Sequence, residues 1–455
     1  MSEIDELRKK MEQITLEMIK LLKSRTEVAQ KIGNIKSELG ITVTDEGRET
    51  KLREKIISEC KTLDLDESIA TRFLNFLLNE SVNVQSKDSQ THLTIFLKAK
   101  EMEKKGKKII HLEVGEPDFD PPESVKKSLS EVYDKGFGKY GPVMGLPEFR
   151  QSIAEFCSKN FQGNVSSDNI LVVPGARFGV YLAISSLLNP GDEIVIIEPA
   201  WPAYRQCAIN AGVKVRTINT TLETKWEPTI EQINSAININ TRMIILNYPN
   251  NPTGKILPEK LQDQIISIAK EHNLFILSDE IYSNYSNNSW KSILSYNYEN
   301  AIVTQSFSKS HSMTGYRIGY VASSSEIVKK LARLQALCLT NVSEPIQFIA
   351  MNSINDDVSK NTNQISEQMK VLIENCQKMD LEFVIPDGAM YVFAKIRDGK
   401  TSTTELAHKL LEHGLAIAPG EAFGYYGEFF RISACVKKES IIAVSYTHLT
   451  LPTKA

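Results

Sequence analysis

The sequence has few of the residues that mark metal sites, disulfide frameworks or nucleic-acid binding. Six cysteines are scattered without a C-x-x-C pair, and seven histidines show no spacing typical of metal ligands. This pattern predicts reduced thiols in a cytoplasmic protein, and no metal site. The formal net charge is −3, from 53 Lys and Arg against 56 Asp and Glu. The first 85 residues carry 14 basic and 16 acidic side chains, so no nucleic-acid partner is expected.

Long hydrophobic runs are also missing. The longest apolar stretch, "ILVVPGARFGVYLAISSLL", is interrupted by Pro174, Gly175 and Arg177, so no membrane span is expected. The N-terminus, "MSEIDELRKK", is acidic and amphipathic and does not resemble a signal peptide. The composition is 42% hydrophobic and 24% charged, which is typical of a globular protein. A length of 455 residues predicts two or three domains.

Residues 1–86 have a helical pattern throughout. One row of residues alternates at spacings of three and four and is apolar except for Arg25. The row consists of Ile4, Leu7, Met11, Ile14, Met18, Leu21, Arg25, Val28, Ile32, Ile35 and Leu39. It predicts a first helix from Glu3 to Leu39, roughly 50 Å long. Shorter helices starting near Asp45 and Asp66 cannot cover such a seam, which favours a helical dimer.

Polar side chains enter the apolar faces of all three predicted helices. Taken singly, each fits a buried polar group that fixes helix register, or a solvated flank. Together they indicate a site for a small anion. The set consists of Arg8, Arg25 and Lys36 on the first helix, Asp45, Arg48 and Glu49 at the second, and Ser81 and Gln85 on the third.

Residues 7–85 resemble the all-helical chorismate mutase family across the whole domain. The segments "LRKKM", "LLKSRTEVAQKIGNIK", "TDEGRE" and "NESVNVQ" stand where that family has its active-site segments. The resemblance implies that Arg25 and Arg8 bind the two carboxylates of chorismate, with Arg8 supplied by the other subunit. It implies that Lys36 and Gln85 donate to the ether oxygen. Glu49 and Asp45 would hold the hydroxyl side, and Arg48 and Ser81 would complete the pocket.

After a polar linker, "SKDSQTH" at 86–92, the pattern changes to alternating strands and helices. Short apolar runs such as "EIVIIEPAWPAY" and "NLFILSDEIY" end in polar residues. Strands buried on both faces predict a largely parallel sheet, with chemistry at its carboxyl edge. Lys309 follows one such strand and Asp279 ends another. Lys309 alone would be read as a surface lysine.

An Asn-Pro-Thr-Gly turn begins at Asn251, and a Pro-Gly-Ala turn at Pro174 opens a helix. With Asp279 and Lys309, these turns supply what pyridoxal phosphate (PLP) chemistry needs. A lysine forms a Schiff base, a carboxylate pairs with the pyridinium, and backbone amides with an arginine bind phosphate.

Residues 93–442 resemble the fold-type I, class I/II aminotransferases. The motifs "GEPDFDPP", "KYGPVMGLPEFR", "PAWPAY", "NYPNNPTG", "SDEIY", "SFSKSHSMTGYRIGY" and "FFRIS" stand in the family's order. The resemblance implies that Lys309 is the Schiff-base lysine and proton shuttle, and that Asp279 binds the ring nitrogen. It assigns Asn251 and Tyr282 to the ring oxygen. It implies that Trp201 stacks on the ring, for which simple packing is the alternative. The phosphate would be bound by Ser306, Arg317, Gly175, Ala176 and, across a dimer, Tyr140. The substrate carboxylate would be bound by Arg431 and Gly115.

The predicted architecture is therefore an all-α three-helix domain (1–86), a linker (87–92) and an α/β PLP-transferase fold (93–442). We expect a large domain at about 131–325, with a mostly parallel sheet. A smaller α+β domain would comprise about 93–130 and 326–442. The last residues, 443–455, have no helical period and look foreign to the family.

The combined prediction is a bifunctional cytoplasmic enzyme of phenylalanine and tyrosine biosynthesis, forming a homodimer or a larger homo-oligomer. It converts chorismate to prephenate and transaminates prephenate or an arylpyruvate, with glutamate or aspartate as donor. One alternative is an aminotransferase with a helical ligand-sensing dimerisation domain. A PLP-fold transcription regulator is disfavoured because the N-terminus is not basic.

Overall fold

The structure is a computed structural model that describes residues 3–38, 46–85, 91–286, 290–379, 381–397 and 402–447. The chain divides into two compact units, Met1–Ser89 and Gln90–Ala455, and each is described by itself. Within the described ranges no helix combines the length and the hydropathy that crossing a membrane requires.

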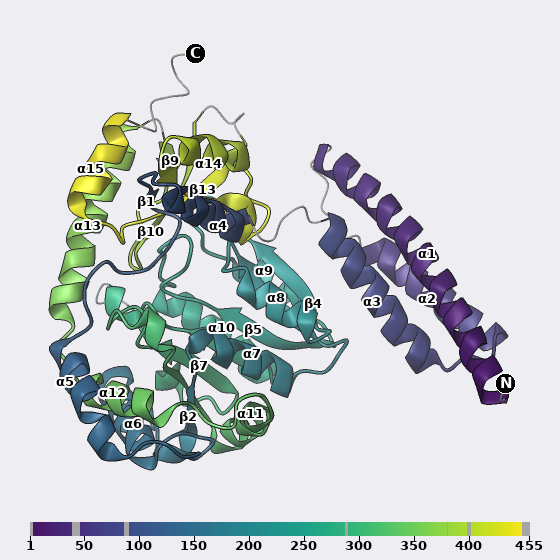
Figure 1. Ribbon diagram of the computed structural model, residues 1–455, viewed down its shortest axis with the longest axis horizontal. Coiled ribbons are helices and arrows are strands. Elements are labelled where there is room, and N and C mark those ends of the chain that lie inside the picture. The colour runs from purple at the N-terminus through teal and green to yellow at the C-terminus, as the bar shows by residue number, and fades with distance from the viewer. Residues whose placement is uncertain are drawn as a thin grey trace. The chain divides into compact units, whose positions relative to one another are not determined.

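The N-terminal unit contains three helices, α1 (Glu3–Glu38), α2 (Glu46–Thr62) and α3 (Glu67–Gln85) (Figure 1). Ala29 of α1, Cys60 of α2 and Leu74 of α3 are buried in this unit. The first half of the predicted apolar row on α1 is not covered, because its side chains from Ile4 to Leu21 are 47–71% exposed. The three helices of one chain therefore cannot bury the whole apolar face of α1.

The second unit is built on a seven-stranded sheet of order β2-β8-β7-β6-β5-β3-β4, in which only β8 runs antiparallel to its neighbours. Its strands are β2 (Ile170–Val173), β3 (Glu193–Glu198), β4 (Lys214–Asn219), β5 (Thr241–Leu246), β6 (Phe275–Asp279), β7 (Ala301–Ser306) and β8 (Gly319–Ser323). The helices between and around them are α5 (Glu123–Glu131), α6 (Pro147–Phe161), α7 (Ala176–Leu187), α8 (Ala203–Asn210), α9 (Ile230–Ala236), α10 (Glu259–Glu271), α11 (Ser325–Cys338) and α12 (Glu344–Ser353).

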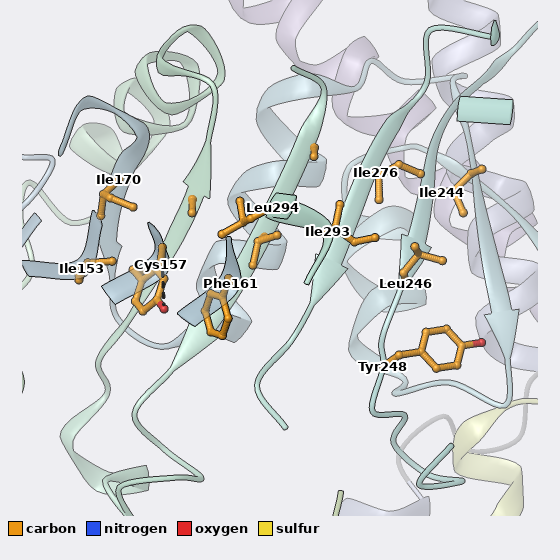
Figure 2. Packing of buried hydrophobic residues seen from close by; sticks show 14 of the residues in the cluster. Ile153, Cys157, Phe161, Ile170, Ile244, Leu246, Tyr248, Ile276, Ile293 and Leu294 are labelled. Carbon is orange, nitrogen blue, oxygen red and sulfur yellow. Dashed lines mark hydrogen bonds between the residues drawn. The ribbon is translucent and has the colours of Figure 1, made fainter. Parts of the chain in front are cut away.

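Both faces of this sheet are covered by helices. Alternate residues of one strand enter different clusters: Ile244 packs with α6, α9 and α10, while Ile245 packs with α7, α8 and α11. Figure 2 shows part of the first cluster, where Ile153 of α6 lies near Ile170 of β2, and Ile276 of β6 lies near Ile244 of β5. Strands buried on both faces are apolar throughout, which explains the unbroken apolar runs in the sequence.

A smaller subdomain surrounds a four-stranded antiparallel sheet of order β12-β13-β10-β9 and a parallel pair, β1 with β11. The strands are β1 (Ile110–His111), β9 (Leu381–Phe383), β10 (Tyr391–Ile396), β11 (Leu415–Ala416), β12 (Ala418–Pro419) and β13 (Phe429–Ser433). The helices are α4 (Thr91–Lys104), α13 (Ser359–Lys378), α14 (Thr403–Glu412) and α15 (Lys438–Thr447). They share one cluster that includes Ile95, Leu372, Leu411 and Ile441.

The packing differs from the predicted boundaries at three places. Helices α11 and α12 lie in the segment assigned to the small subdomain, but Leu331 and Ile349 pack on the seven-stranded sheet. Helix α5 also packs on this sheet, through Val125, although this residue lies before the boundary predicted at about residue 131. At the C-terminus, α15 continues to Thr447, so the prediction that helical structure is missing from residue 443 onward was wrong for its first residues. Of the predicted linker 87–92, only 91 and 92 are described, and they belong to α4.

Candidate active sites

In the helical unit, Arg25 connects α1 to α3. Its Nη1 donates to the backbone oxygen of Leu77 at 2.7 Å and to the hydroxyl of Ser81. The Ser81 hydroxyl also donates to Leu77 O, at 2.8 Å. Burial lowers the pKa of the Arg25 guanidinium. The structure therefore brings together two of the predicted site residues, Arg25 and Ser81.

The other predicted residues of this unit are less fully described. Arg8 is exposed and lies 3.6 Å from Asp5. It precedes Arg25 by about 25 Å along the helix axis at 1.5 Å per residue, so it cannot reach the same small ligand within one chain. Lys36 is half-buried and Arg48 is exposed. Asp45 and the side chains of Glu49 and Gln85 lie outside the described residues, and their roles stay predictions.

In the second unit, three neighbouring parallel strands bring the predicted cofactor residues to one edge. Asp279 ends β6, Lys309 follows β7, and Asn251 lies in the loop after β5. The carboxyl ends of parallel strands meet at one edge of a sheet, where ligands of α/β proteins bind. The predicted clustering of these residues thus follows from the strand order.

Asp279 is buried and only half satisfied. Its Oδ2 accepts a hydrogen bond from the Tyr204 hydroxyl at 2.7 Å, while its Oδ1 is buried without a hydrogen-bond partner among the described residues. Burial raises the pKa of this carboxyl to about 6, and the Tyr204 hydrogen bond opposes the rise. An unpartnered buried carboxylate oxygen is costly unless a ligand supplies a proton or a cation.

Lys309 is held with its amine toward the segment that follows β1. Its Nζ donates to the backbone oxygen of Gly115 at 2.6 Å, and its own carbonyl accepts from the Tyr285 hydroxyl at 2.8 Å. Burial lowers the pKa of the amine, and the positive charges of Arg431 and Arg317 add to the effect. A lowered pKa increases the neutral fraction of the amine, which is the form that transfers protons and forms covalent bonds. Gly115 was predicted at the substrate carboxylate, whereas its carbonyl contacts the lysine here.

Arg431, on β13, is oriented by two acceptors and two rings. Nη1 donates to Asn251 Oδ1 at 2.7 Å, and Nη2 donates to the backbone oxygen of Glu113. The rings of Tyr391 and Phe423 lie 4.3 and 4.9 Å from its Cζ. Nε is buried and has no hydrogen-bond partner within the described ranges. A buried arginine with an unused donor is suited to hold a carboxylate.

Asn251 and Tyr282, which we predicted at the ring oxygen, have protein partners in the structure. Asn251 accepts from Arg431 as described, and the hydroxyls of Tyr282 and Tyr391 lie 2.8 Å apart. The side chain of Asn247 connects Asn251 to Asp279. It accepts a hydrogen bond from Asn251 N at 3.0 Å and donates one to the backbone oxygen of Asp279 at 2.9 Å.

The predicted phosphate residues gather at the N-terminus of α7. Gly175 precedes this helix with φ +87°, and a Cβ there would lie 2.7 Å from Nη2 of Arg317. Ser306 is paired with Gly319 across β7 and β8, and a Cβ added at Gly319 would lie 3.1 Å from Ala176 N. Helix N-termini present unpaired amides that bind anions, and glycine allows this approach. The structure therefore brings Ser306, Arg317, Gly175 and Ala176 together.

Trp201 and Tyr140 differ in their surroundings. Trp201 packs edge-on against Tyr204 at 5.3 Å between ring centroids, and Cζ of Arg177 lies 4.9 Å from its ring centroid. Tyr140 is 88% exposed on the single chain, and its contribution across a dimer stays a prediction.

The sequence alone did not predict roles for Tyr204, Asn247, Tyr391 and Glu113. Tyr204 and Asn247 stand inside the motifs "PAWPAY" and "NYPNNPTG", so their motifs carried a signal. Tyr391 and Glu113 come from β10 and the segment after β1, and no local pattern distinguishes them.

Comparison with known families explains this arrangement. Residues 107–444 match aminotransferase class I and II, and residues 7–86 match chorismate mutase type II. The chain belongs to the class I and II aminotransferases. Its N-terminal unit is a chorismate mutase domain. Both family predictions and the predicted fold class are confirmed, and the chain is an enzyme. The aminotransferase family uses PLP, and both domains act on small molecules.

Individual aminotransferases resemble the chain over most of its length. Aspartate aminotransferase of Pyrococcus horikoshii is 34% identical over 358 residues, which cover 76% of this chain and 90% of that protein. A probable aspartate/prephenate aminotransferase of Aquifex aeolicus is 32% identical, and the match covers 77% of this chain and 92% of that protein. A solved structure, an aromatic aminotransferase from P. horikoshii, aligns with a TM-score of 0.73 at 31% identity, covering 76% and 96% of the two chains.

Proposed function

We propose that this aminotransferase converts chorismate to prephenate in its helical domain and transaminates prephenate to arogenate in its second domain. The observation that carries the proposal is the union, in one chain, of a chorismate mutase domain with an aminotransferase domain related to a probable aspartate/prephenate aminotransferase. The product of the first reaction is then the amino acceptor of the second. Glutamate or aspartate is the proposed donor, and the relation to aspartate aminotransferases supports the latter.

The mutase reaction is an intramolecular rearrangement and needs no nucleophile. The site has to hold a compact conformer of chorismate and stabilise the charge that develops on the ether oxygen. Arg25 is proposed to exchange its bonds to Leu77 and Ser81 for a substrate carboxylate. Arg8 of a second chain would hold the other carboxylate. Lys36 and Gln85 would face the ether oxygen, and the remaining residues of the set would surround the hydroxyl side.

The second domain fits PLP by its own chemistry. Asp279 has a buried, unpartnered oxygen suited to a protonated ring nitrogen, and the Gly175–Arg317 corner is suited to a phosphate. Bound PLP would supply an electron-withdrawing ring that carries the amino group between donor and acceptor. Asn251 and Tyr282 would hold the ring oxygen, Trp201 would stack on the ring, and Ser306, Arg317, Gly175, Ala176 and a second chain's Tyr140 would hold the phosphate.

Lys309 is proposed to transfer the proton, and Arg431 is proposed to bind the substrate carboxylate. Lys309 Nζ would take a proton from the substrate α-carbon and deliver it in a 1,3-transfer, which its lowered pKa favours. Arg431 would fix the α-carboxylate through the donor that has no described partner, so that the α-carbon faces the lysine. Desolvation of this site by burial strengthens both interactions.

We also propose a homodimer or a larger homo-oligomer. The exposed apolar face of α1 and the exposure of Arg8 and Tyr140 support this proposal, because each could contact a second chain. The six free thiols support a cytoplasmic setting as part of this proposal.

Assays of the purified full-length protein test the function. Mutase activity is measured by the loss of chorismate, and amino transfer is compared among prephenate, phenylpyruvate and 4-hydroxyphenylpyruvate. Preferred amination of prephenate supports arogenate formation, whereas turnover of the arylpyruvates alone would overturn it. A full-length protein with aminotransferase activity and no mutase activity would favour the alternative, in which residues 1–86 sense an aromatic ligand.

A further inference from the structure

One side of Arg431 is fixed by a buried carboxylic residue that the proposed reaction does not use. The two acceptors that orient the guanidinium are Asn251 Oδ1 and the backbone oxygen of Glu113. The Glu113 carbonyl therefore sets the direction of one arm of the arginine. Its position depends on where the rest of Glu113 is held.

A buried carboxylate such as that of Glu113 is stable only if a cation neutralises its charge. The residue is 2% exposed, and its Oε2 has no hydrogen-bond partner among the described residues. The single ion pair recorded for Glu113 within the described ranges joins its Oε1 to His111 Nδ1, at 2.8 Å. An uncompensated carboxylate at such a position is strongly unfavourable.

His111 lies between two carboxylates. On its other side, Nε2 lies 3.2 Å from Oε1 of Glu103 on α4, and Glu103 is also paired with Lys100 at 2.9 Å. The neighbouring strand β11 contributes only Leu415 and Ala416. Among the residues that the structure describes, the charged groups paired with the imidazole are thus Glu113 from its own segment and Glu103 from α4, and the other oxygen of Glu103 is paired with Lys100. The hydrogen bond to Glu113 raises the pKa of His111, burial opposes the rise, and Glu103 adds to it.

We propose that His111 is a positioning residue for Arg431: its imidazolium form neutralises Glu113 and so keeps the Glu113 carbonyl on the guanidinium. This inference rests on the proposed role of Arg431 as the carboxylate clamp. When His111 loses its proton, the buried carboxylate of Glu113 has no cation in contact. The carboxylate is then drawn toward water or toward Arg431, where it competes with the carboxylate of the substrate.

The sign of the pH effect follows from the direction of the shift. A histidine whose folded pKa is raised holds its proton below that pKa and releases it as the pH rises through it. The clamp is therefore fully formed at lower pH and loosens as the pH rises. Affinity for the amino donor should fall in this direction, while the chemical step on Lys309 is changed less.

The test measures KM and kcat for aspartate with the PLP-loaded full-length protein, from about pH 6 to about pH 9. We expect the KM of the wild type to rise about threefold to tenfold across a step, the size of one typical hydrogen bond. His111→Gln should remove the step and hold KM at its high-pH value, with kcat changed less than about twofold. His272→Gln, at an exposed histidine after α10, is the matched control and should keep the step.

A second variant keeps the proposal testable if His111→Gln does not fold. Glu103→Gln removes a charge that raises the pKa of His111, so the step should move to lower pH without loss of low-pH affinity. An unchanged step in His111→Gln, or an unmoved midpoint in Glu103→Gln, would overturn the positioning role. Arg431→Lys separates this failure from failure of the proposed clamp, because an unchanged KM in that variant would refute the clamp itself.

Discussion

Replacing Arg25 with leucine should separate the stability of the helical domain from its activity. The guanidinium donates to Leu77 O and to Ser81, and these bonds are worth about 1.5–3 kcal/mol each when the donor is charged. Leu77 O keeps the hydrogen bond from Ser81, so the substitution leaves no buried acceptor unsatisfied.

Two terms favour the leucine. Its burial in the seam contributes about 1.5–3 kcal/mol at most, and the desolvation cost that lowers the pKa of Arg25 disappears. The two lost hydrogen bonds, about 3–6 kcal/mol together, and the two terms that favour leucine are of similar size, so Arg25→Leu should change the stability of the domain by no more than about 1 kcal/mol, which corresponds to about 4–8 °C in the midpoint of thermal unfolding. Circular dichroism on heating measures this change.

The mutase reaction, in contrast to the stability, should be strongly impaired. Loss of one partner of a buried charge pair costs about 2–5 kcal/mol, so kcat/KM for chorismate should fall by about thirtyfold to several thousandfold. Aminotransferase activity should stay unchanged. Lys23→Leu removes a charge from an exposed position on the same helix and should leave the mutase intact. If Arg25→Leu keeps its mutase activity, Arg25 only fixes the helix register and the ligand assignment is wrong.

Three further predictions concern the aminotransferase domain. Tyr204→Phe removes a hydrogen bond that opposes the rise in the pKa of Asp279, which is about 6 with this bond in place. The pKa should therefore rise further, and the acid limb of the aminotransferase pH–rate profile should move to higher pH. An acid limb that does not move would show that the ionisation of Asp279 does not control the reaction. Gly175→Ala places a Cβ 2.7 Å from Arg317 Nη2, so titration of the apoenzyme with PLP should show an affinity reduced about tenfold or more. Gly191 has a similar φ but open space around it, so Gly191→Ala should leave the affinity for PLP unchanged. Lys309→Arg should lower aminotransferase turnover more than about a thousandfold with mutase activity retained, and comparable loss of both activities would indicate misfolding instead.

The strand-end residues could be predicted because local pattern and topology agree. Asp279, Lys309 and Asn251 each follow an apolar run, and β5, β6 and β7 are neighbours in a parallel sheet. Any such sheet brings these side chains to one edge, whatever the details of packing.

Residues that reach the site from the small subdomain could not be predicted in the same way. Tyr391 is close to Arg431 because β10 pairs with β13, with Phe393 opposite Arg431. Glu113 contacts Arg431 through its carbonyl, which carries no sequence information. The assignment of α11 and α12 failed for a related reason: their apolar faces are equally suited to either subdomain, and tertiary packing decides between them.

The uncovered apolar face of α1 has a consequence for kinetics. In the proposed dimer the exposed side chains of Ile4, Leu7, Met11 and Ile14 are covered by a second chain, and this association depends on protein concentration. Under the proposed dimer, the mutase rate per chain falls on dilution below the dissociation constant, because Arg8 leaves the site along with the second helix. Aminotransferase activity depends on the dissociation constant of its own subunit contact. If the two dissociation constants differ, dilution alone can abolish one of the two activities while the other is retained.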